Sequence, residues 1–146
     1  MSLRADESDQ ADTTVTVLIC DDNAAMRTML GVVVDSSPGL RVVGEAGDGN
    51  EAVAEARVRQ PDVILLDLAM PNRSGLEAIP DIRAVAPNTR IIVLSGFAAA
   101  AVADEVLALG AASYVEKGAH PDAIVASIEH AVSDTQASPI ALTVPG

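Results

Sequence analysis

Short apolar segments alternate with longer segments of helical period from residue 15 to residue 132. The alternation predicts strands at Val15–Cys20, Leu40–Ala46, Val63–Leu66, Arg90–Leu94 and Ser113–Val115. Five segments in which apolar residues recur every three or four positions lie between and after these strands, which indicates five amphipathic helices. Strands that alternate with helices are typical of an α/β fold with a parallel sheet. We therefore predict a doubly wound sheet of five strands in the flavodoxin-like order 2-1-3-4-5.

One proline conflicts with this pattern. The Pro and Gly residues generally fall between a predicted helix and a predicted strand, where turns are expected. Pro121 suits the first position of the last helix. Pro80, however, falls inside the third helical pattern, where its ring would clash with the carbonyl of Leu76. We therefore expect the third helix to start late or to kink.

The length and the ends of the chain indicate one domain with a tail on either side. A chain of 146 residues can bury a core but is short for two domains. Residues 1–14 are polar and acidic and lack the basic start and apolar stretch of a secretory signal, so we expect a disordered tail. Residues 133–146 lose the helical period and gain Ser, Thr and Pro, which predicts a linker or C-terminal tail. The folded domain is thus expected to span residues 15–132.

The composition argues against several classes of function. Nine Lys and Arg against 21 Asp and Glu give a net charge of -12, which would repel the phosphates of a nucleic acid. The longest apolar run, residues 97–103, has seven residues, whereas a membrane helix needs about 20. The single cysteine, Cys20, cannot form an internal disulfide and fits a reducing compartment. We expect a cytoplasmic protein that by itself binds neither nucleic acid nor membrane.

Polar residues collect where the predicted strands end. Asp21 and Asp22 follow the first strand, Asp67 the third, Ser95 the fourth and Lys117 the fifth. Open α/β sheets bind ligands beyond the carboxyl ends of their strands, at the point where the strand order reverses. In the order 2-1-3-4-5 the first and third strands are neighbours. The three carboxylates should therefore share one crevice.

Three carboxylates at close range require a cation, since they cannot all stay ionised without one. Ligands that are all oxygen, with no His or Cys among them, favour Mg2+. The fifth strand should lie about 10 Å from the third, so a side chain as long as Lys117 is needed to reach Asp67, whereas Ser95 is one strand away. A carboxylate nucleophile, a metal, an ammonium and a hydroxyl are the groups that phosphoryl transfer requires.

Each of these residues also has an ordinary structural interpretation. A single Asp after a strand most often serves in a turn or as a helix cap, so the hypothesis depends on the whole set of polar residues. Cys20 is best interpreted as a small buried apolar residue. His120 is expected to cap the last helix, and His130 to lie on the surface of that helix. Neither histidine has metal-ligand partners near it in the pattern.

Four stretches of the chain together resemble response regulator receiver domains, over about residues 15–132. They are Leu18–Asp22, Val63–Pro71 with Gly75, Ile91–Gly96 and Gly110–Lys117. The resemblance implies a CheY-like fold in which Asp67 is the phosphoacceptor. It further implies that Asp22 is a direct Mg2+ ligand, that Asp21 acts mainly through water, and that Ala69 contributes its backbone carbonyl.

The same resemblance implies a switch and a partner. Lys117 would pair with the phosphoryl group, Ser95 would move to hydrogen-bond it, and Tyr114 would swing inward behind Ser95. The donor would be a phosphohistidine on a sensor histidine kinase or a phosphotransfer protein. The sequence does not decide whether phosphorylation produces a homodimer. Such a domain is a signalling switch and not an enzyme, because self-phosphorylation and self-dephosphorylation are its only reactions.

Residues 117–119 bear on the type of receiver. Gly118 follows Lys117 where many receivers have Pro, so a cis Lys-Pro bond is excluded. The sequence Lys-Gly-Ala is more similar to receivers attached to helix-turn-helix domains of the NarL type. Because only 14 residues follow Val132, a stand-alone receiver and a receiver whose output domain has been removed both stay open.

Two side chains bear on how long the phosphoryl group would last. Ala69 and Phe97 lie two residues beyond Asp67 and Ser95, so both should border the phosphoryl group and its attacking water. Neither side chain can orient that water. We therefore expect slow self-dephosphorylation.

Two alternatives come from other classes of function. Phosphatases of the haloacid dehalogenase type also form an aspartyl phosphate, but they carry an Asp-x-Asp pattern after the first strand, whereas Asp21 and Asp22 are adjacent here. An interaction module on the same fold could also work without phosphorylation. Loss of an acidic ligand or of the lysine would indicate such a module, and all of them are present.

Overall fold

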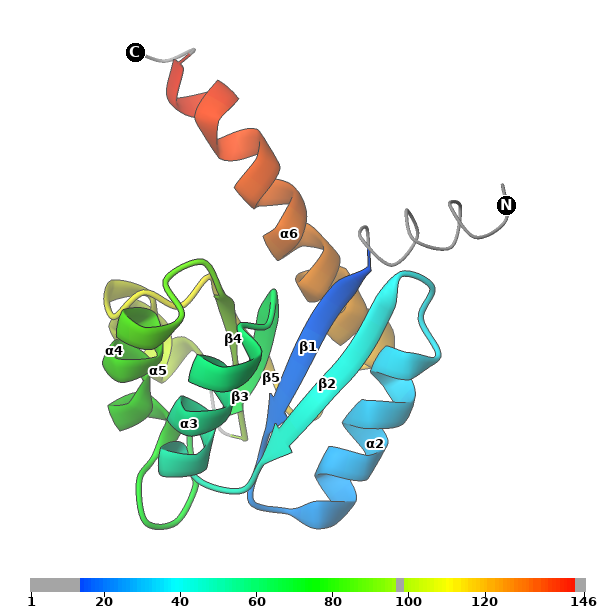
Figure 1. Ribbon diagram of the computed structural model, residues 1–146, viewed down its shortest axis with the longest axis vertical. Coiled ribbons are helices and arrows are strands. Elements are labelled where there is room, and N and C mark those ends of the chain that lie inside the picture. The colour runs from blue at the N-terminus through cyan, green and yellow to red at the C-terminus, as the bar shows by residue number, and fades with distance from the viewer. Residues whose placement is uncertain (1–13, 97–98, 144–146) are drawn as a thin grey trace.

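Five parallel strands form a single sheet in the order β2-β1-β3-β4-β5 (Figure 1). The computed structural model describes residues 14–96 and 99–143, with residues 99–101 and 134–143 described by their backbone alone. The strands are β1 (Val15–Cys20), β2 (Leu40–Ala46), β3 (Val63–Asp67), β4 (Arg90–Ser95) and β5 (Ser113–Glu116). The predicted sheet and strand order are confirmed, and each predicted strand matches the observed one to within a residue at its carboxyl end.

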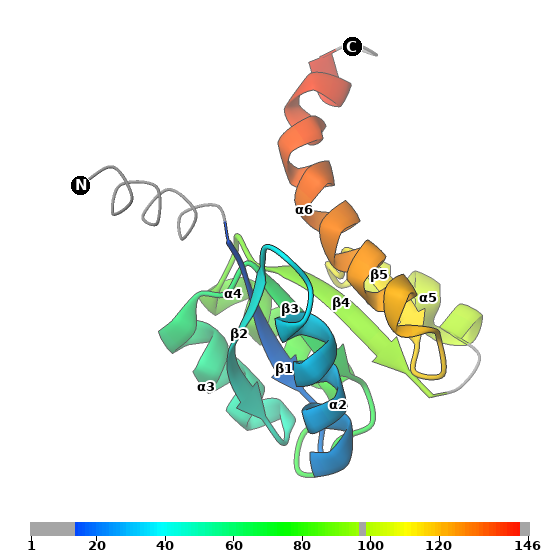
Figure 2. The same cartoon turned by 90° about the vertical axis from the view of Figure 1, so that its right-hand side faces the viewer.

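Helices cover both faces of the sheet. They are α2 (Ala24–Asp35), α3 (Gly49–Arg59), α4 (Gly75–Val85), α5 (Ala99–Ala108) and α6 (Pro121–Thr143). Apolar residues of α2 and α6 pack on one face of the sheet, and those of α3, α4 and α5 pack on the other. Figure 2 shows α2 and α6 together in front of the sheet. The doubly wound, flavodoxin-like architecture is therefore confirmed.

Alternate residues of the central strands belong to different halves of the core. In β3, Ile64 and Leu66 pack with the helices of one face, while Val63 and Leu65 pack with those of the other. All four side chains are fully buried. A strand covered on both faces has no polar alternation, which is why β3 is an unbroken apolar run up to Asp67. That run places Asp67 at the carboxyl edge of the sheet.

Helix α4 differs from the expectation for Pro80. The expected late start is wrong, because the helix begins at Gly75, five residues before the proline. A reciprocal capping box fixes this start: Ser74 Oγ accepts from Glu77 N at 3.1 Å, and Glu77 Oε1 accepts from Ser74 N at 3.1 Å. Because proline has no N–H, the Leu76 carbonyl loses its helical hydrogen bond. Pro80 is exposed, so this carbonyl lies on the side of the helix where water can donate to it instead.

The last helix continues past the expected end of the domain. Its backbone remains helical to Thr143, and Figure 1 shows this part of α6 extending away from the sheet. The segment expected as a linker or tail is thus helical at the backbone, and its role as a linker stays a prediction. No helix in the described part of the chain is both long enough and apolar enough to span a membrane.

Three residues with ordinary structural interpretations have those roles. His120 Nδ1 accepts a hydrogen bond from Asp122 N at 3.1 Å, so His120 caps α6 as expected, and His130 is exposed on the same helix. Cys20 is fully buried, and burial raises the pKa of its thiol. The thiol is therefore a packed, unreactive group.

Candidate acidic site at the carboxyl ends of the strands

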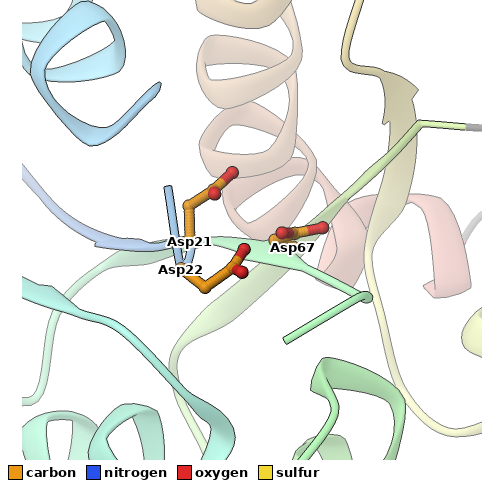
Figure 3. Close-up of side chains that lie close together, drawn as sticks. All are labelled: Asp21, Asp22 and Asp67. Carbon is orange, nitrogen blue, oxygen red and sulfur yellow. The ribbon is translucent and has the colours of Figure 1, made fainter. Parts of the chain in front are cut away.

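Three carboxylates meet at the carboxyl edge of β1 and β3 (Figure 3). Asp21 and Asp22 follow β1, and Asp67 ends β3, its neighbour in the sheet. One carboxylate oxygen from each lies within 4.8 Å of the others. Asp21 is 0% exposed and Asp67 is 2% exposed, whereas Asp22 is open to solvent. The cluster therefore has two buried members and one accessible member.

Lys117 connects the two buried carboxylates. It follows β5, two strands from Asp67, and its Nζ lies 3.0 Å from Asp67 Oδ2 and 3.0 Å from Asp21 Oδ2. The backbone N–H of Lys117 donates to the Ser95 carbonyl at 2.8 Å, which fixes where the side chain starts. Burial alone would lower the pKa of Lys117, but its contacts with Asp21 and Asp67 raise it. The ammonium therefore stays charged.

The site carries more negative than positive charge. Burial raises the pKa of Asp67, although the nearby Lys117 ammonium and the hydrogen bond from the Ala69 N–H oppose the shift. Two buried oxygens, Asp21 Oδ2 and Asp67 Oδ2, accept no hydrogen bond from the described residues, and each forms an ion pair with Lys117. With one ammonium for three carboxylates, the donor set fits a small, hard divalent cation.

Backbone contacts hold the acidic residues in place. Asp21 Oδ1 accepts from Asn23 N at 2.9 Å, and Asp67 Oδ1 accepts from Ala69 N at 3.1 Å. These bonds orient each carboxylate with respect to the turn that follows its strand. Ala69 is exposed beside the cluster.

Ser95 and Tyr114 occupy neighbouring strands on the same side of the sheet. Ser95 ends β4, is 6% exposed, and lies one residue beyond Leu94, the partner of Asp67. Tyr114 pairs with Val93 of β4. Ser95 lies two residues after Val93 in the same strand, so the two side chains point to the same face of the sheet. The Tyr114 side chain is 36% exposed. Phe97 lies outside the described residues.

An arginine that the sequence analysis missed supports the acidic turn. Arg27, on α2, donates from Nη1 to the Asp21 carbonyl at 2.7 Å and from Nε to Glu45 Oε1 at 3.0 Å. It thus ties the end of β1 to the end of β2. No spacing rule singles out Arg27, because its two partners lie 6 and 18 residues away.

The loop from β3 to α4 is also held by contacts that the sequence analysis missed. Asn72 has a left-handed backbone (φ 65°) and donates to Asp48 Oδ2 at 2.8 Å. The N–H of Gly49 donates to the Arg73 carbonyl at 2.8 Å. The pKa of Asp48 is lowered by hydrogen bonds from Glu51 N–H and Asn72. The Pro-Asn pair was the available signal for this turn.

Comparisons with known proteins agree on the family. The family model described as response regulator receiver domain matches residues 17–129. The chain is 36% identical over 117 residues to the uncharacterized transcriptional regulatory protein YxjL of Bacillus subtilis, covering 80% of this chain and 54% of YxjL. It is 37% identical over 112 residues to the chemotaxis protein CheY of Thermotoga maritima, covering 77% of this chain and 92% of CheY.

Solved structures agree with the fold. The response regulator domain of Thermotoga maritima CheB superposes with a TM-score of 0.75 at 35% sequence identity, covering 82% of this chain and 97% of that structure. The chain spans about half the length of YxjL, 54%. The similarity to YxjL thus concerns the part of that protein that aligns with this chain.

Proposed function

Since the chain belongs to the response regulator receiver family of two-component systems, we propose that it accepts a phosphoryl group on Asp67 in a reaction that requires Mg2+. The observation that carries the proposal is the buried Asp67 carboxylate, within 4.8 Å of the two other carboxylates and 3.0 Å from the Lys117 ammonium. The direct test is uptake of one phosphoryl group from acetyl phosphate by the wild-type chain but not by Asp67→Asn.

The residues that would hold Mg2+ are Asp22, Asp67, the backbone carbonyl of Ala69 and, mainly through water, Asp21. The bound ion would neutralise charge on the phosphoryl oxygens as the group is transferred. Asp22 suits direct coordination because it is the exposed member of the cluster. Asp21 is buried and already engaged by Lys117, which suits a less direct contact.

The residues of this chain would carry out the transfer as follows. A carboxylate oxygen of Asp67 attacks the phosphorus, and the bond from phosphorus to the nitrogen of the donor phosphohistidine breaks. Lys117 exchanges its contact with Asp67 for one with the phosphoryl oxygens. Ser95, at the end of the adjacent strand, donates its hydroxyl to another of these oxygens. The side of the sheet that carries Ser95 and Tyr114 then presents a changed surface to a partner or an output domain.

The partner that supplies the phosphoryl group would be a sensor histidine kinase or a phosphotransfer protein. A receiver-like module that works without phosphorylation remains the second candidate, and absence of phosphoryl uptake would favour it. Adjacent Asp21 and Asp22 after β1 give no support to a haloacid dehalogenase type phosphatase, for which turnover of a phosphate ester would be required.

The Mg2+ site can be tested through stability. Mg2+ at ten times its dissociation constant should raise the free energy of unfolding of the wild-type chain by about 1.4 kcal/mol. Asp22→Asn should abolish this gain and change the metal-free stability by less than about 0.5 kcal/mol, because Asp22 is exposed. Urea unfolding with and without Mg2+ measures both. Asp104→Asn makes the same charge change at an exposed position of α5 and should retain the full stabilisation by Mg2+. An equal loss of this stabilisation in Asp104→Asn would rule out the assigned site.

The lifetime of the phosphoryl group can be tested at residue 97. Phe97→Gln should speed loss of phosphate by about tenfold, because a carboxamide can orient the attacking water and the phenyl ring cannot. Phe97→Leu, which keeps an apolar side chain, should leave the rate close to wild type. Intact mass, followed after removal of the phosphodonor, gives the rates. An unchanged rate in Phe97→Gln would contradict the expected slow self-dephosphorylation.

A further inference from the structure

A cleft opens at the other edge of the sheet from the acidic site, where β4 and β5 begin. Arg90 is the first residue of β4 and Ser113 the first of β5, so both lie a full strand away from Ser95 and Lys117. The wall opposite the strands comes from α6, and Arg83 from the last turn of α4 closes one side. The cleft has a volume of about 690 Å³, within the range of small-molecule sites. We call it the basal cleft.

Among the described residues, the lining of the basal cleft has two guanidinium groups and no carboxylate. Arg83, Arg90 and His130 line it, and none of its lining residues within the described part of the chain is Asp or Glu. This is unusual in a chain with 21 acidic residues and a net charge of -12. The basal cleft is therefore a local exception to the acidic surface.

The arginine on α4 is oriented by backbone groups. Arg83 donates from Nη1 to the carbonyls of Pro87 and Thr89, at 3.0 and 3.2 Å. These bonds use one of its three nitrogens, and Nε and Nη2 have no hydrogen-bond acceptor among the described residues, so both remain as donors. Arg90 and His130 take part in interactions of their own within the chain. A guanidinium that the chain already holds in place loses little freedom when it binds an anion.

A hydroxyl in the lining points independently to a missing ligand group. Ser113 Oγ is buried and has no hydrogen-bond partner among the described residues. A buried hydroxyl without a partner is destabilising, and a rotation about one side-chain bond would turn it toward an occupant of the cleft. Ser127 supplies a second hydroxyl from α6.

We propose that the basal cleft binds a small polyanion that carries phosphate or carboxylate groups. Guanidinium groups match the paired oxygens of either group, and the cleft is large enough for a metabolite rather than a single inorganic ion. The site is separate from the acidic cluster and needs no phosphorylation of Asp67. Its occupant would contact β4 and β5, which also carry Ser95 and Tyr114, and it would contact the C-terminal helix α6.

The test is an amide NMR titration of the full chain in Mg2+-free buffer at low salt, with pyrophosphate and, separately, succinate. Without metal the acidic cluster repels anions, so the expected shifts fall at residues 110–113 and 126–131 and not at 21, 22 or 67. Ser127→Glu places a negative charge in the lining and should weaken binding by about tenfold or more. Ala123→Glu, the same charge change at an exposed position of α6, should bind as wild type.

A second variant guards against a fold defect in the first. Arg83→Gln removes the free guanidinium donors and should also weaken binding by about tenfold. Response to pyrophosphate alone would assign phosphate as the recognised group, and response to succinate alone would assign carboxylate. The proposal is overturned if neither anion shifts the cleft amides at about 10 mM, the weak end of specific binding. It is also overturned if Ser127→Glu and Ala123→Glu bind equally well.

Discussion

Replacing Gly75 by alanine should lower the free energy of unfolding by about 2–3 kcal/mol. A Cβ at this position would lie 2.1 Å from the backbone oxygen of Asp67 and 3.0 Å from the Cα of Leu68. The obstructing atoms are backbone, so no side chain can rotate away. Either α4 or the end of β3 must move. The second outcome would also displace the carboxylate of Asp67, and Mg2+ should then stabilise the variant less than the wild type.

The matched control for this substitution is Gly31→Ala. Gly31 lies inside α2, and a Cβ there would meet nothing within 4 Å. Alanine in a helix interior should raise the free energy of unfolding by about 0.5–1 kcal/mol relative to glycine. Urea unfolding of both variants measures the two effects, which should have opposite signs. Equal stability of the two variants would show that β3 and α4 are not packed as described.

Replacing Lys117 by methionine should lower the free energy of unfolding by about 2 kcal/mol in metal-free buffer. The substitution leaves the buried carboxylates of Asp21 and Asp67 facing each other without their shared counter-ion. We expect less than the largest losses seen for broken buried pairs, because the Lys117 side chain is 23% exposed. Mg2+ should restore much of the loss, since the ion would supply positive charge to the same carboxylates.

The control for Lys117→Met is Arg41→Met, which gives the same change in net charge. Arg41 is exposed on β2, away from the cluster. Its loss should change the free energy of unfolding by less than about 0.5 kcal/mol, and Mg2+ should stabilise this variant as much as the wild type. Urea unfolding with and without Mg2+ gives all four values. If Lys117→Met is as stable as wild type without metal, the ion pairs at 3.0 Å do not contribute as described.

The architecture could be predicted because its signals are local. A strand buried on both faces is an unbroken apolar run, as in β3, and its end is marked by the first polar residue, Asp67. Once the strand order was inferred, the neighbouring ends of β1 and β3 followed, and so did the cluster of Asp21, Asp22 and Asp67. The meeting of these carboxylates depends on topology more than on side-chain detail.

The parts that could not be predicted depend on contacts between residues far apart in the sequence, or on which of two opposing interactions is stronger. Lys117 was expected to reach Asp67, but its equal contact with Asp21 depends on where the buried ammonium best compensates two charges. The late start expected from Pro80 was wrong because the capping box at Ser74 stabilises the first turn of α4, and the alternative of a kink stays a prediction. The contact between Arg27 and the Asp21 carbonyl needs the three-dimensional position of α2.

The measurement that tests the central claim most directly is intact mass after incubation with acetyl phosphate. The wild-type chain with Mg2+ should gain one phosphoryl group, about 80 Da. Asp67→Asn with Mg2+, and wild type with the metal chelated, should gain none. Asp62→Asn, a change of the same kind at an exposed residue on the other edge of the sheet, should still be phosphorylated. Uptake that persists in Asp67→Asn, or no uptake by the wild type, would contradict the assignment of Asp67 as the phosphoacceptor.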